Sequence, residues 1–237
     1  MEIKSALYLI PVGISDAPPG DVIPTGVTEI MAPIHHFIVE NVRTARRWLR
    51  RCMPHCDIDS MTFHELNRHT DLSEIGAWLD PLRQGLPMGI MSEAGCPGVA
   101  DPGAAVVAIA QREGLTVVPL AGPSSILMAL MASGFNGQGF TFNGYLPIEE
   151  GARAAAIRRL EKSARNQGIS QIFIETPYRN QKLLATLTET LRPDTLLCVA
   201  CGITDPEKES VKTLPASRWR QQPPLPAKTP AVFVIGS

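Results

Sequence analysis

The chain of 237 residues contains no run of about 18 consecutive apolar residues, so we expect no membrane-spanning helix. Its first apolar stretch, residues 6–11, is too short for a secretory signal. The formal net charge is only −1, which excludes attraction of a nucleic acid to the whole surface and leaves only a local basic patch. The five cysteines are an odd number without a regular framework, which is typical of a reducing compartment. We therefore expect a cytoplasmic protein.

Two nucleotide-binding patterns are also missing. The chain has neither Gly-x-Gly-x-x-Gly nor Gly-Lys-Ser/Thr, which disfavours a nicotinamide dinucleotide and a nucleoside triphosphate. Cys198 and Cys201 have the spacing of a metal or redox pair, but they lie in an apolar strand, where this offset points side chains to opposite faces. Cys52, His55 and Cys56 lack an evident fourth ligand. We expect Cys198 and Cys201 to be buried structural cysteines, and we expect no metal site.

Short apolar runs alternate with helical patterns in the first half of the chain. This alternation predicts a mostly parallel sheet with helices on its faces. Pro81 is expected to bend or end one of these helices, and Ser124 is a suitable N-cap for another. The expected strands are 6–11, 36–40, 58–65, 88–92 and 116–120, and the expected helices are 44–52, 72–84, 104–113 and 124–133.

The second half of the chain has fewer helices per strand, which predicts a mixed sheet. Three glycines fall within residues 134–139 and indicate a hinge or a boundary. We expect an α/β protein of two α/β domains, residues 1–122 and 123–237. The expected strands are 140–146, 170–175, 195–203, 210–213 and 231–235, and the expected helices are 152–167 and 179–191.

The most informative segment is 92–103, which reads Ser-Glu-Ala-Gly-Cys-Pro-Gly-Val-Ala-Asp-Pro-Gly. It lies between a predicted strand and a predicted helix, where open α/β sheets bind ligands. Glycine allows a ligand to approach the bare backbone, and proline stiffens the loop. Similar small-residue turns follow two other strands, at 11–16 and 120–125. We expect the three loops to converge, with Pro11, Gly13, Glu93 and Gly95 at a binding site that Cys96 lines.

These loops resemble those of the tetrapyrrole methylase superfamily of S-adenosylmethionine-dependent methyltransferases. Within it, the chain is most similar to the ribosomal small-subunit methyltransferase I group, which 2′-O-methylates a cytidine of 16S rRNA. The matching segments follow in order from about Leu7 to Ile235. They are 7–13 (Leu-Tyr-Leu-Ile-Pro-Val-Gly), 92–103, 119–124 (Pro-Leu-Ala-Gly-Pro-Ser), 142–147 (Phe-Asn-Gly-Tyr-Leu-Pro) and 175–179 (Glu-Thr-Pro-Tyr-Arg).

The resemblance implies two α/β domains that hold S-adenosylmethionine between them, usually in a homodimer. It implies that the backbone of residues 96–99, including Cys96 and Val99, touches the cofactor. It also implies contacts from the turn at Ser124 and Ser125, and from Ile174 in the second domain.

The chain departs from the group at several positions. Asn41 stands where the group has an acid after the second strand, Glu93 replaces its Asp, and segment 201–204 lacks two charges of an Arg-Glu-Leu-Thr-like motif. The chain ends at Ser237, so we expect it to lack the group's small C-terminal extension. Methyl transfer is therefore better supported than the rRNA target.

Methyl transfer to a ribose hydroxyl needs an aligned nucleophile and removal of its proton. Glu40 and Glu175 each end a predicted strand and are each followed within four residues by an arginine. We expect one of them to act as general base while Arg43 and Arg179 orient the substrate; surface ion pairs are the alternative. Five arginines lie at position 43 and within the predicted helix 44–52. They form either a phosphate-binding stripe or a solvated face.

Three functions remain open. The first is an rRNA 2′-O-methyltransferase-like enzyme that acts on rRNA or the small ribosomal subunit. The second is a methyltransferase for a small macrocycle such as a corrin or porphyrin precursor. The third is a non-catalytic module that binds S-adenosylmethionine.

Overall fold

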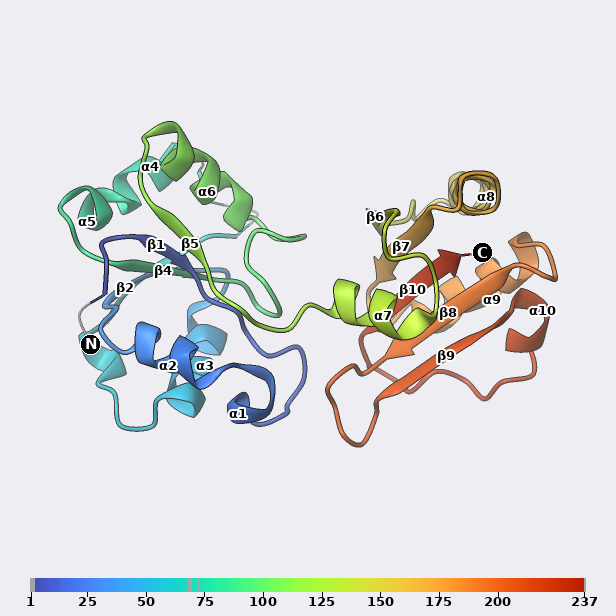
Figure 1. Cartoon of the computed structure of the whole chain (residues 1–237), viewed down its shortest axis with the longest axis horizontal. Coiled ribbons are helices and arrows are strands. Elements are labelled where there is room, and N and C mark those ends of the chain that lie inside the picture. Colours follow the sequence, from blue (N-terminus) through green and yellow to red (C-terminus); the bar gives the residue numbers. More distant parts are fainter. Residues whose placement is uncertain (1–2, 68–69, 72, 237) are drawn as a thin grey trace. The chain divides into compact units, whose positions relative to one another are not determined.

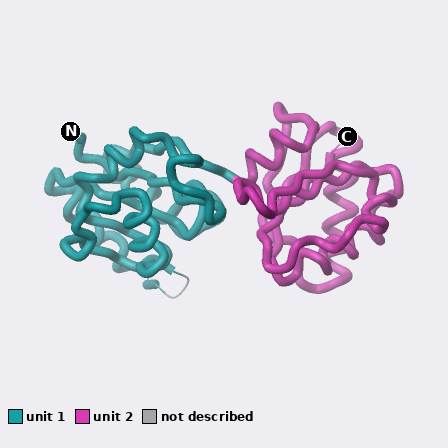
Figure 2. The backbone as a smooth tube through the Cα atoms, turned by 90° about the horizontal axis from the view of Figure 1, so that it is seen from below, with its two compact units in different colours: residues 1–124 teal, residues 125–237 magenta. Residues whose placement is uncertain are grey.

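The computed structural model describes residues 3–67, 70–71 and 73–236 (Figure 1). It divides into two compact units, residues 1–124 and 125–237 (Figure 2). The glycine-rich stretch 134–139 lies inside the second unit, where it connects a helix to a strand, so it does not separate the units.

The first unit alternates strands and helices along the chain. Its elements are β1 (Leu7–Leu9), α1 (Pro19–Val22), α2 (Thr25–Met31), β2 (His36–Val39), α3 (Val42–Cys52), the 3₁₀ helix η1 (Ile58–Ser60), β3 (Thr62–Glu65), α4 (Ile75–Trp78), α5 (Asp80–Arg83), β4 (Met88–Met91), α6 (Gly103–Arg112) and β5 (Val117–Pro119).

All five strands of the first unit are parallel, in the order β3-β2-β4-β1-β5. Parallel strands are buried on both faces, which explains their nearly continuous apolar sequences. Alternate side chains face two separate clusters. Tyr8 and Phe37 pack with α1, α2 and α3 on one face, whereas Leu7 and Ile38 pack with α4, α5 and α6 on the other (Figure 1).

The five strands predicted in the first half of the chain are all present, but not all of its helices were predicted. Helices α1 and α2 were not predicted. The expected helix 72–84 is two short helices, α4 and α5, and Pro81 stands in the first turn of α5, where its missing N–H needs no acceptor. Leu72 lies outside the described residues. The expected strand 58–65 begins only at Thr62, because residues 58–60 form η1.

The second unit has five strands and four helices among its described residues. Its elements are α7 (Ser125–Ser133), β6 (Phe140–Tyr145), α8 (Glu150–Gln167), β7 (Ser170–Glu175), α9 (Asn180–Thr190), β8 (Leu196–Cys201), β9 (Ser210–Pro215), α10 (Ala216–Trp219) and β10 (Ala231–Gly236). Helix α10 was not predicted.

The sheet of the second unit is mixed, as expected. Its order is β6-β7-β10-β8-β9; β6 and β7 are parallel, and the remaining pairs are antiparallel. Phe173 and Phe233 stack at 5.8 Å between ring centroids in the core beneath α8 and α9. Helix α7 packs against β10, β8 and β9. The predicted α/β class, with a parallel first sheet and a mixed second sheet, is confirmed.

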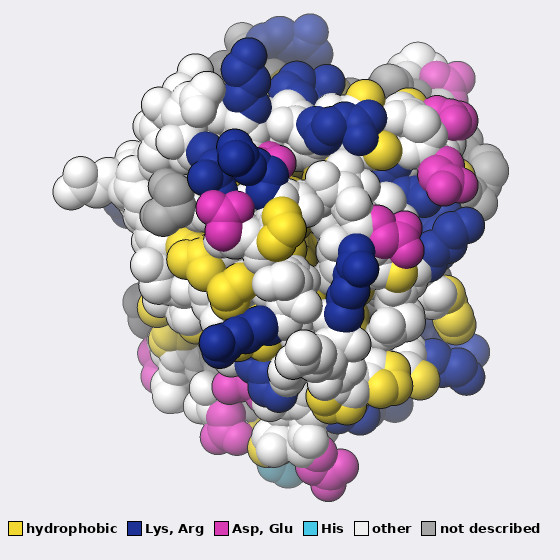
Figure 3. Space-filling model, turned by 90° about the vertical axis from the view of Figure 1, so that its right-hand side faces the viewer, with side chains coloured by type: hydrophobic (Ala, Val, Ile, Leu, Met, Phe, Trp, Pro, Cys, Tyr) yellow, Lys and Arg dark blue, Asp and Glu magenta, His cyan; other side chains and the backbone are white. Residues whose placement is uncertain are grey.

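The two units differ in charge. Residues 1–124 contain 9 Lys and Arg against 14 Asp and Glu, a net charge of −5, and residues 125–237 contain 13 against 9, a net charge of +4. On the face drawn in Figure 3, Lys and Arg side chains lie interspersed with Asp and Glu side chains. Among the described residues, no helix combines the length and the apolar character needed to cross a bilayer.

Candidate functional site

The connections of the first unit diverge at the carboxyl ends of β1 and β4. These strands are neighbours in the sheet, but the chain leaves β1 toward the α1–α3 face and leaves β4 toward the α6 face. Adjacent connections that diverge in this way leave a space for ligands in open α/β sheets. The loops after β1, β4 and β5 all lie at this edge.

The loops after β1 and β4 are joined by two backbone hydrogen bonds. The Val12 N–H donates to the Gly95 carbonyl and the Gly95 N–H donates to the Val12 carbonyl, each at 2.9 Å. Gly95 has a φ of +75°, a conformation that favours glycine. Beneath the same loop, a Cβ added to Gly13 would lie 2.9 Å from the ring of Trp48, so α3 supports this turn closely.

The loop after β5 is held against the other two. The Cys96 thiol lies 3.4 Å from the Pro123 carbonyl oxygen. A Cβ added to Gly122 would lie only 2.2 Å from Cβ of Pro11, so the loops after β1 and β5 touch through bare backbone. The structure therefore brings together the three loops that the sequence predicted to converge. Burial raises the pKa of the Cys96 thiol, which keeps it protonated at neutral pH and unsuited to act as a nucleophile.

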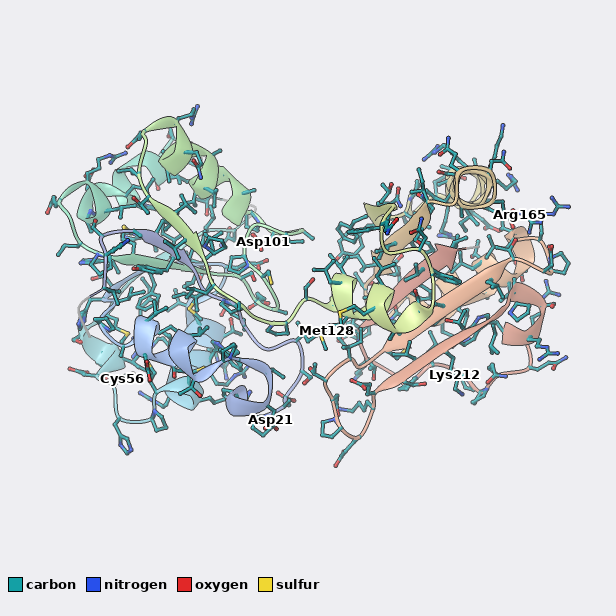
Figure 4. The ribbon with its side chains drawn as sticks, viewed as in Figure 1. Asp21, Cys56, Asp101, Met128, Arg165 and Lys212 are labelled. Atoms are coloured by element: carbon teal, nitrogen blue, oxygen red, sulfur yellow. The ribbon has the colours of Figure 1, made fainter. Side chains whose placement is uncertain are left out.

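Asp101 fixes the shape of the loop after β4. Figure 4 labels this residue. Its carboxylate accepts hydrogen bonds from the Gly98 N–H at 2.9 Å and from the Gly103 N–H at 2.7 Å. Within the described part of the chain, the N–H group of Cys96 has no acceptor. The loop thus presents a free backbone donor at Cys96, while its own turn is closed by Asp101. Sequence reasoning did not assign this role to Asp101, although an Asp between two glycines is typical of such turns.

Carboxylates gather beside these loops. The Glu40 carboxylate follows β2 and accepts a hydrogen bond from the Glu93 N–H at 3.0 Å. The Glu93 carboxylate accepts one from the Thr44 hydroxyl at 2.8 Å. Burial raises the pKa of Glu40, the Glu93 N–H partly offsets this, and the charges of Glu93 and Asp101 raise it further. Thr44 is a second residue that the sequence analysis missed.

Asn41 has a clear structural role at the start of α3. Its side-chain oxygen accepts a hydrogen bond from the Thr44 N–H at 3.1 Å, so Asn41 is the N-cap of this helix. Asn and Asp cap helices about equally well. The replacement of an acid by Asn41 therefore keeps the cap and removes a negative charge next to Glu40. Arg43 lies in the first turn of the same helix and is exposed.

In the second unit, Glu175 and Arg179 form an ion pair. Glu175 ends β7 and is buried, and its Oε1 accepts hydrogen bonds from the Thr176 N–H at 2.7 Å and from two nitrogens of Arg179 at 2.7 and 3.0 Å. This carboxylate oxygen is fully engaged in holding the turn and the guanidinium. Glu175 thus holds the Arg179 guanidinium, and its second carboxylate oxygen, like that of Glu40, has no hydrogen-bond partner among the described residues.

Ile174 precedes this pair and is the only residue of β7 that is not buried. Its neighbour across the sheet is Tyr145, which follows a break in the β6 register and is 58% exposed. Tyr178, in the turn after β7, is 80% exposed. Ser124 ends the loop after β5, and Ser125 begins α7. The predicted residues thus gather in two groups, one in each unit.

The cysteines form no metal site in the part of the chain that the structure describes. No group of three or more His, Cys, Asp or Glu side chains there is placed to hold a metal ion. Cys198 and Cys201 are buried free thiols, and burial raises the pKa of Cys201 to about 11. Cys201 packs in the core beneath α8 and α9, whereas Cys198 does not, in agreement with their predicted divergence.

Comparison with solved structures defines the class of fold. The chain is similar to the methyltransferase CobJ, with a TM-score of 0.64, 20% identity, and coverage of 98% of this chain and 94% of that one. It is also similar to the cobalt precorrin-4 methyltransferase CbiF, with a TM-score of 0.59, 14% identity, and coverage of 98% and 95%. The chain therefore has the fold of the tetrapyrrole methyltransferases. No protein-family model matches it.

The relatives found by sequence point to a narrower group of methyltransferases than the solved structures do. The chain is 31% identical over 185 residues to ribosomal RNA small subunit methyltransferase I of Vibrio cholerae, which covers 78% of this chain and 60% of the relative. It is 31% identical over 209 residues to the protein of the same name from Micromonospora olivasterospora, covering 88% and 63%. The matched region thus spans about three fifths of these relatives' length. The resemblance stated from the loop motifs is confirmed.

Proposed function

We propose that the chain is an S-adenosylmethionine-dependent methyltransferase that acts on a ribose 2′-hydroxyl of ribosomal RNA. The observation that carries the proposal is the joining of the loops after β1, β4 and β5 into one backbone-lined rim, in a chain whose sequence relatives are named rRNA methyltransferases. We also propose the cytoplasm as its location, supported by five free thiols, and a homodimeric assembly.

The chemistry of the rim fits S-adenosylmethionine. The free N–H group of Cys96 suits an acceptor atom of the cofactor, and we propose that Gly13, Gly95 and Val99 lie at the same site. The carboxylates of Glu40 and Glu93 place negative charge near a cationic ligand. We propose that Pro11, Ser124, Ser125 and, from the second unit, Ile174 complete the binding site.

When bound, S-adenosylmethionine supplies an electrophilic methyl group, so the chain's own residues have to position the acceptor and take its proton. We assign the proton to Glu40, because its raised pKa makes it a stronger base than an exposed carboxylate. Arg43 and Arg179 orient the substrate, and Glu175 holds the Arg179 guanidinium through two hydrogen bonds. The Glu93 N–H fixes one carboxylate oxygen of Glu40 and leaves the other to meet the hydroxyl.

A macrocycle methyltransferase is the second candidate, because the fold is shared with tetrapyrrole methyltransferases. A non-catalytic binding module is the third. One assay separates the three: purified protein is incubated with methyl-labelled S-adenosylmethionine and with small ribosomal subunits, free rRNA or tetrapyrroles. Label in rRNA that alkaline hydrolysis cannot cleave at the modified ribose supports the proposal. Label in the macrocycle, or binding of the cofactor without any transfer, contradicts it.

A further inference from the structure

Helix α3 carries five arginines in eleven residues, although the first unit is otherwise strongly acidic. More than half of the nine basic residues of this unit therefore lie on one helix. The five side chains line a shallow depression of about 380 Å³. The lining residues are Arg43, Arg46, Arg47, Arg50 and Arg51. The sequence alone does not separate arginines with a structural role from the others, whereas their contacts do.

Two of the five arginines are engaged within the fold. Arg46 pairs with Asp59 and lies over the ring of Phe63 at 5.7 Å. Arg51 donates hydrogen bonds to the carbonyls of Asp16 and Ala17, at 2.9 and 2.8 Å. These contacts tie α3 to the loop after β1 and to the region around β3. Arg46 and Arg51 therefore have a structural role.

The other three arginines are exposed and have no acidic partner among the described residues. They are Arg43, Arg47 and Arg50, and their spacing of i, i+4, i+7 places them on one face of α3. Like charges at this spacing destabilise a helix. The described acidic residues therefore leave this row of guanidinium groups without local neutralisation.

We propose that Arg43, Arg47 and Arg50 bind successive phosphates of a single-stranded phosphodiester chain. The helix rise of about 1.5 Å per residue spreads them over roughly 10 Å, which suits two or three neighbouring phosphates. The planar guanidinium fork matches phosphate geometry. The row begins directly after Glu40 and Asn41, so it leads a bound strand to the candidate base. The identity of the strand as RNA rests on the proposed function.

An anionic membrane surface fits these observations less well. Helices that lie on membranes insert an apolar face beside their basic one. The apolar side chains of α3, which are Ala45, Trp48 and Leu49, are buried in the core of the first unit. The exposed face of α3 is therefore its arginine face, which has no apolar side chains that could insert into a membrane.

The test compares binding of a fluorescein-labelled single-stranded RNA of about 20 nucleotides by the intact protein, measured by fluorescence anisotropy over a series of KCl concentrations. The variant is the double substitution Arg47→Gln/Arg50→Gln. Its matched control is Arg112→Gln, which removes an exposed arginine from α6 on the opposite face of the same sheet. Melting temperatures of all three proteins establish that they are folded.

We expect the double variant to bind the RNA roughly tenfold or more weakly at low salt, and the slope of log Kd against log salt to fall by about 1.4, since each phosphate contact on a single strand contributes about 0.7. Arg112→Gln keeps the wild-type affinity and slope. An unchanged slope in the folded double variant overturns the proposal. Loss of binding to phosphatidylserine vesicles with unchanged RNA binding overturns it in favour of a membrane surface.

Calorimetry with S-adenosylmethionine separates this inference from the proposed function. The double variant is expected to bind the cofactor as the wild type does. If the wild type binds no cofactor but shows the arginine-dependent salt slope, the proposed function fails and the phosphate site stands. If the cofactor binds and the slope is unchanged in the double variant, the proposed function stands and the phosphate site fails.

Discussion

At the scale of single residues, Glu40 is the side chain on which the proposed chemistry depends most. It acts as a base only when ionised, and its pKa lies above the usual range because it is partly buried. We expect Glu40→Gln to lower turnover by about 10²–10⁴-fold, and the wild-type rate to rise with pH through this raised pKa. Rate–pH profiles on methyl-labelled rRNA measure both. Turnover of Glu40→Gln at the wild-type rate would remove Glu40 from the mechanism.

The same substitution predicts a change in stability. Because the pKa of Glu40 is higher in the folded than in the unfolded chain, ionisation of this group destabilises the fold. The destabilisation is absent below the unfolded pKa of about 4.5 and complete above the raised folded pKa. We expect Glu40→Gln to raise the melting temperature at pH 7.5 and to leave it unchanged near pH 4. A lower melting temperature at pH 7.5 would show that the Glu93–Glu40 hydrogen bond outweighs the burial of charge.

Substitution of Gly122 tests the contact between the loops after β1 and β5. Its added Cβ would lie 2.2 Å from Cβ of Pro11, so Gly122→Ala has to push the loops after β1 and β5 apart. We expect a loss of stability of about 1–3 kcal/mol and at least tenfold weaker binding of S-adenosylmethionine by calorimetry. Gly76→Ala is the control, because nothing lies within 4 Å of its added Cβ. Equal cofactor affinity in both variants would show that the loop contact does not shape the site.

At the scale of elements, α3 depends on its first turn. Asn41 accepts the Thr44 N–H, and its removal leaves that donor without its partner. We expect Asn41→Ala to lower the free energy of unfolding by about 1 kcal/mol in urea, while Asn41→Asp keeps the cap. A loss of the same size in both variants would mean that the added charge beside Glu40 matters as much as the cap.

The strands and the loops after them were accessible from sequence, because β-branched runs and glycine-rich turns are strong local signals. Helices α1 and α2 were missed because they are short; α1 begins at Pro19 and α2 follows Pro24, and neither shows a long apolar period. Residues that act through distant partners were also missed. Nothing local indicates that Thr44 meets Glu93, or that Asp59 neutralises Arg46 but not Arg47. Such pairings join residues that are distant in the sequence, so they depend on the tertiary structure and leave no local signal.

At the scale of the whole molecule, each unit contains its own sheet and its own buried clusters. A unit with an independent core is expected to fold alone. We expect a fragment of residues 125–237 to unfold cooperatively on heating and to retain the near-ultraviolet circular dichroism of Trp219, which is buried and donates its indole N–H to the Leu197 carbonyl. A fragment without a cooperative transition would show that this unit needs the first one for its stability.

Asp101 sets the backbone path of the loop after β4 independently of the exposed side chains that the loop carries. The loop is held through main-chain N–H groups of two glycines, so its curvature does not depend on the side chain of Val99, which is exposed. Substitution at Val99 can therefore alter which molecule the rim accepts while the path of the chain stays the same. For anyone who redesigns this protein for other acceptors, this position offers variation at little risk to folding, and Asp101 is the residue to leave untouched.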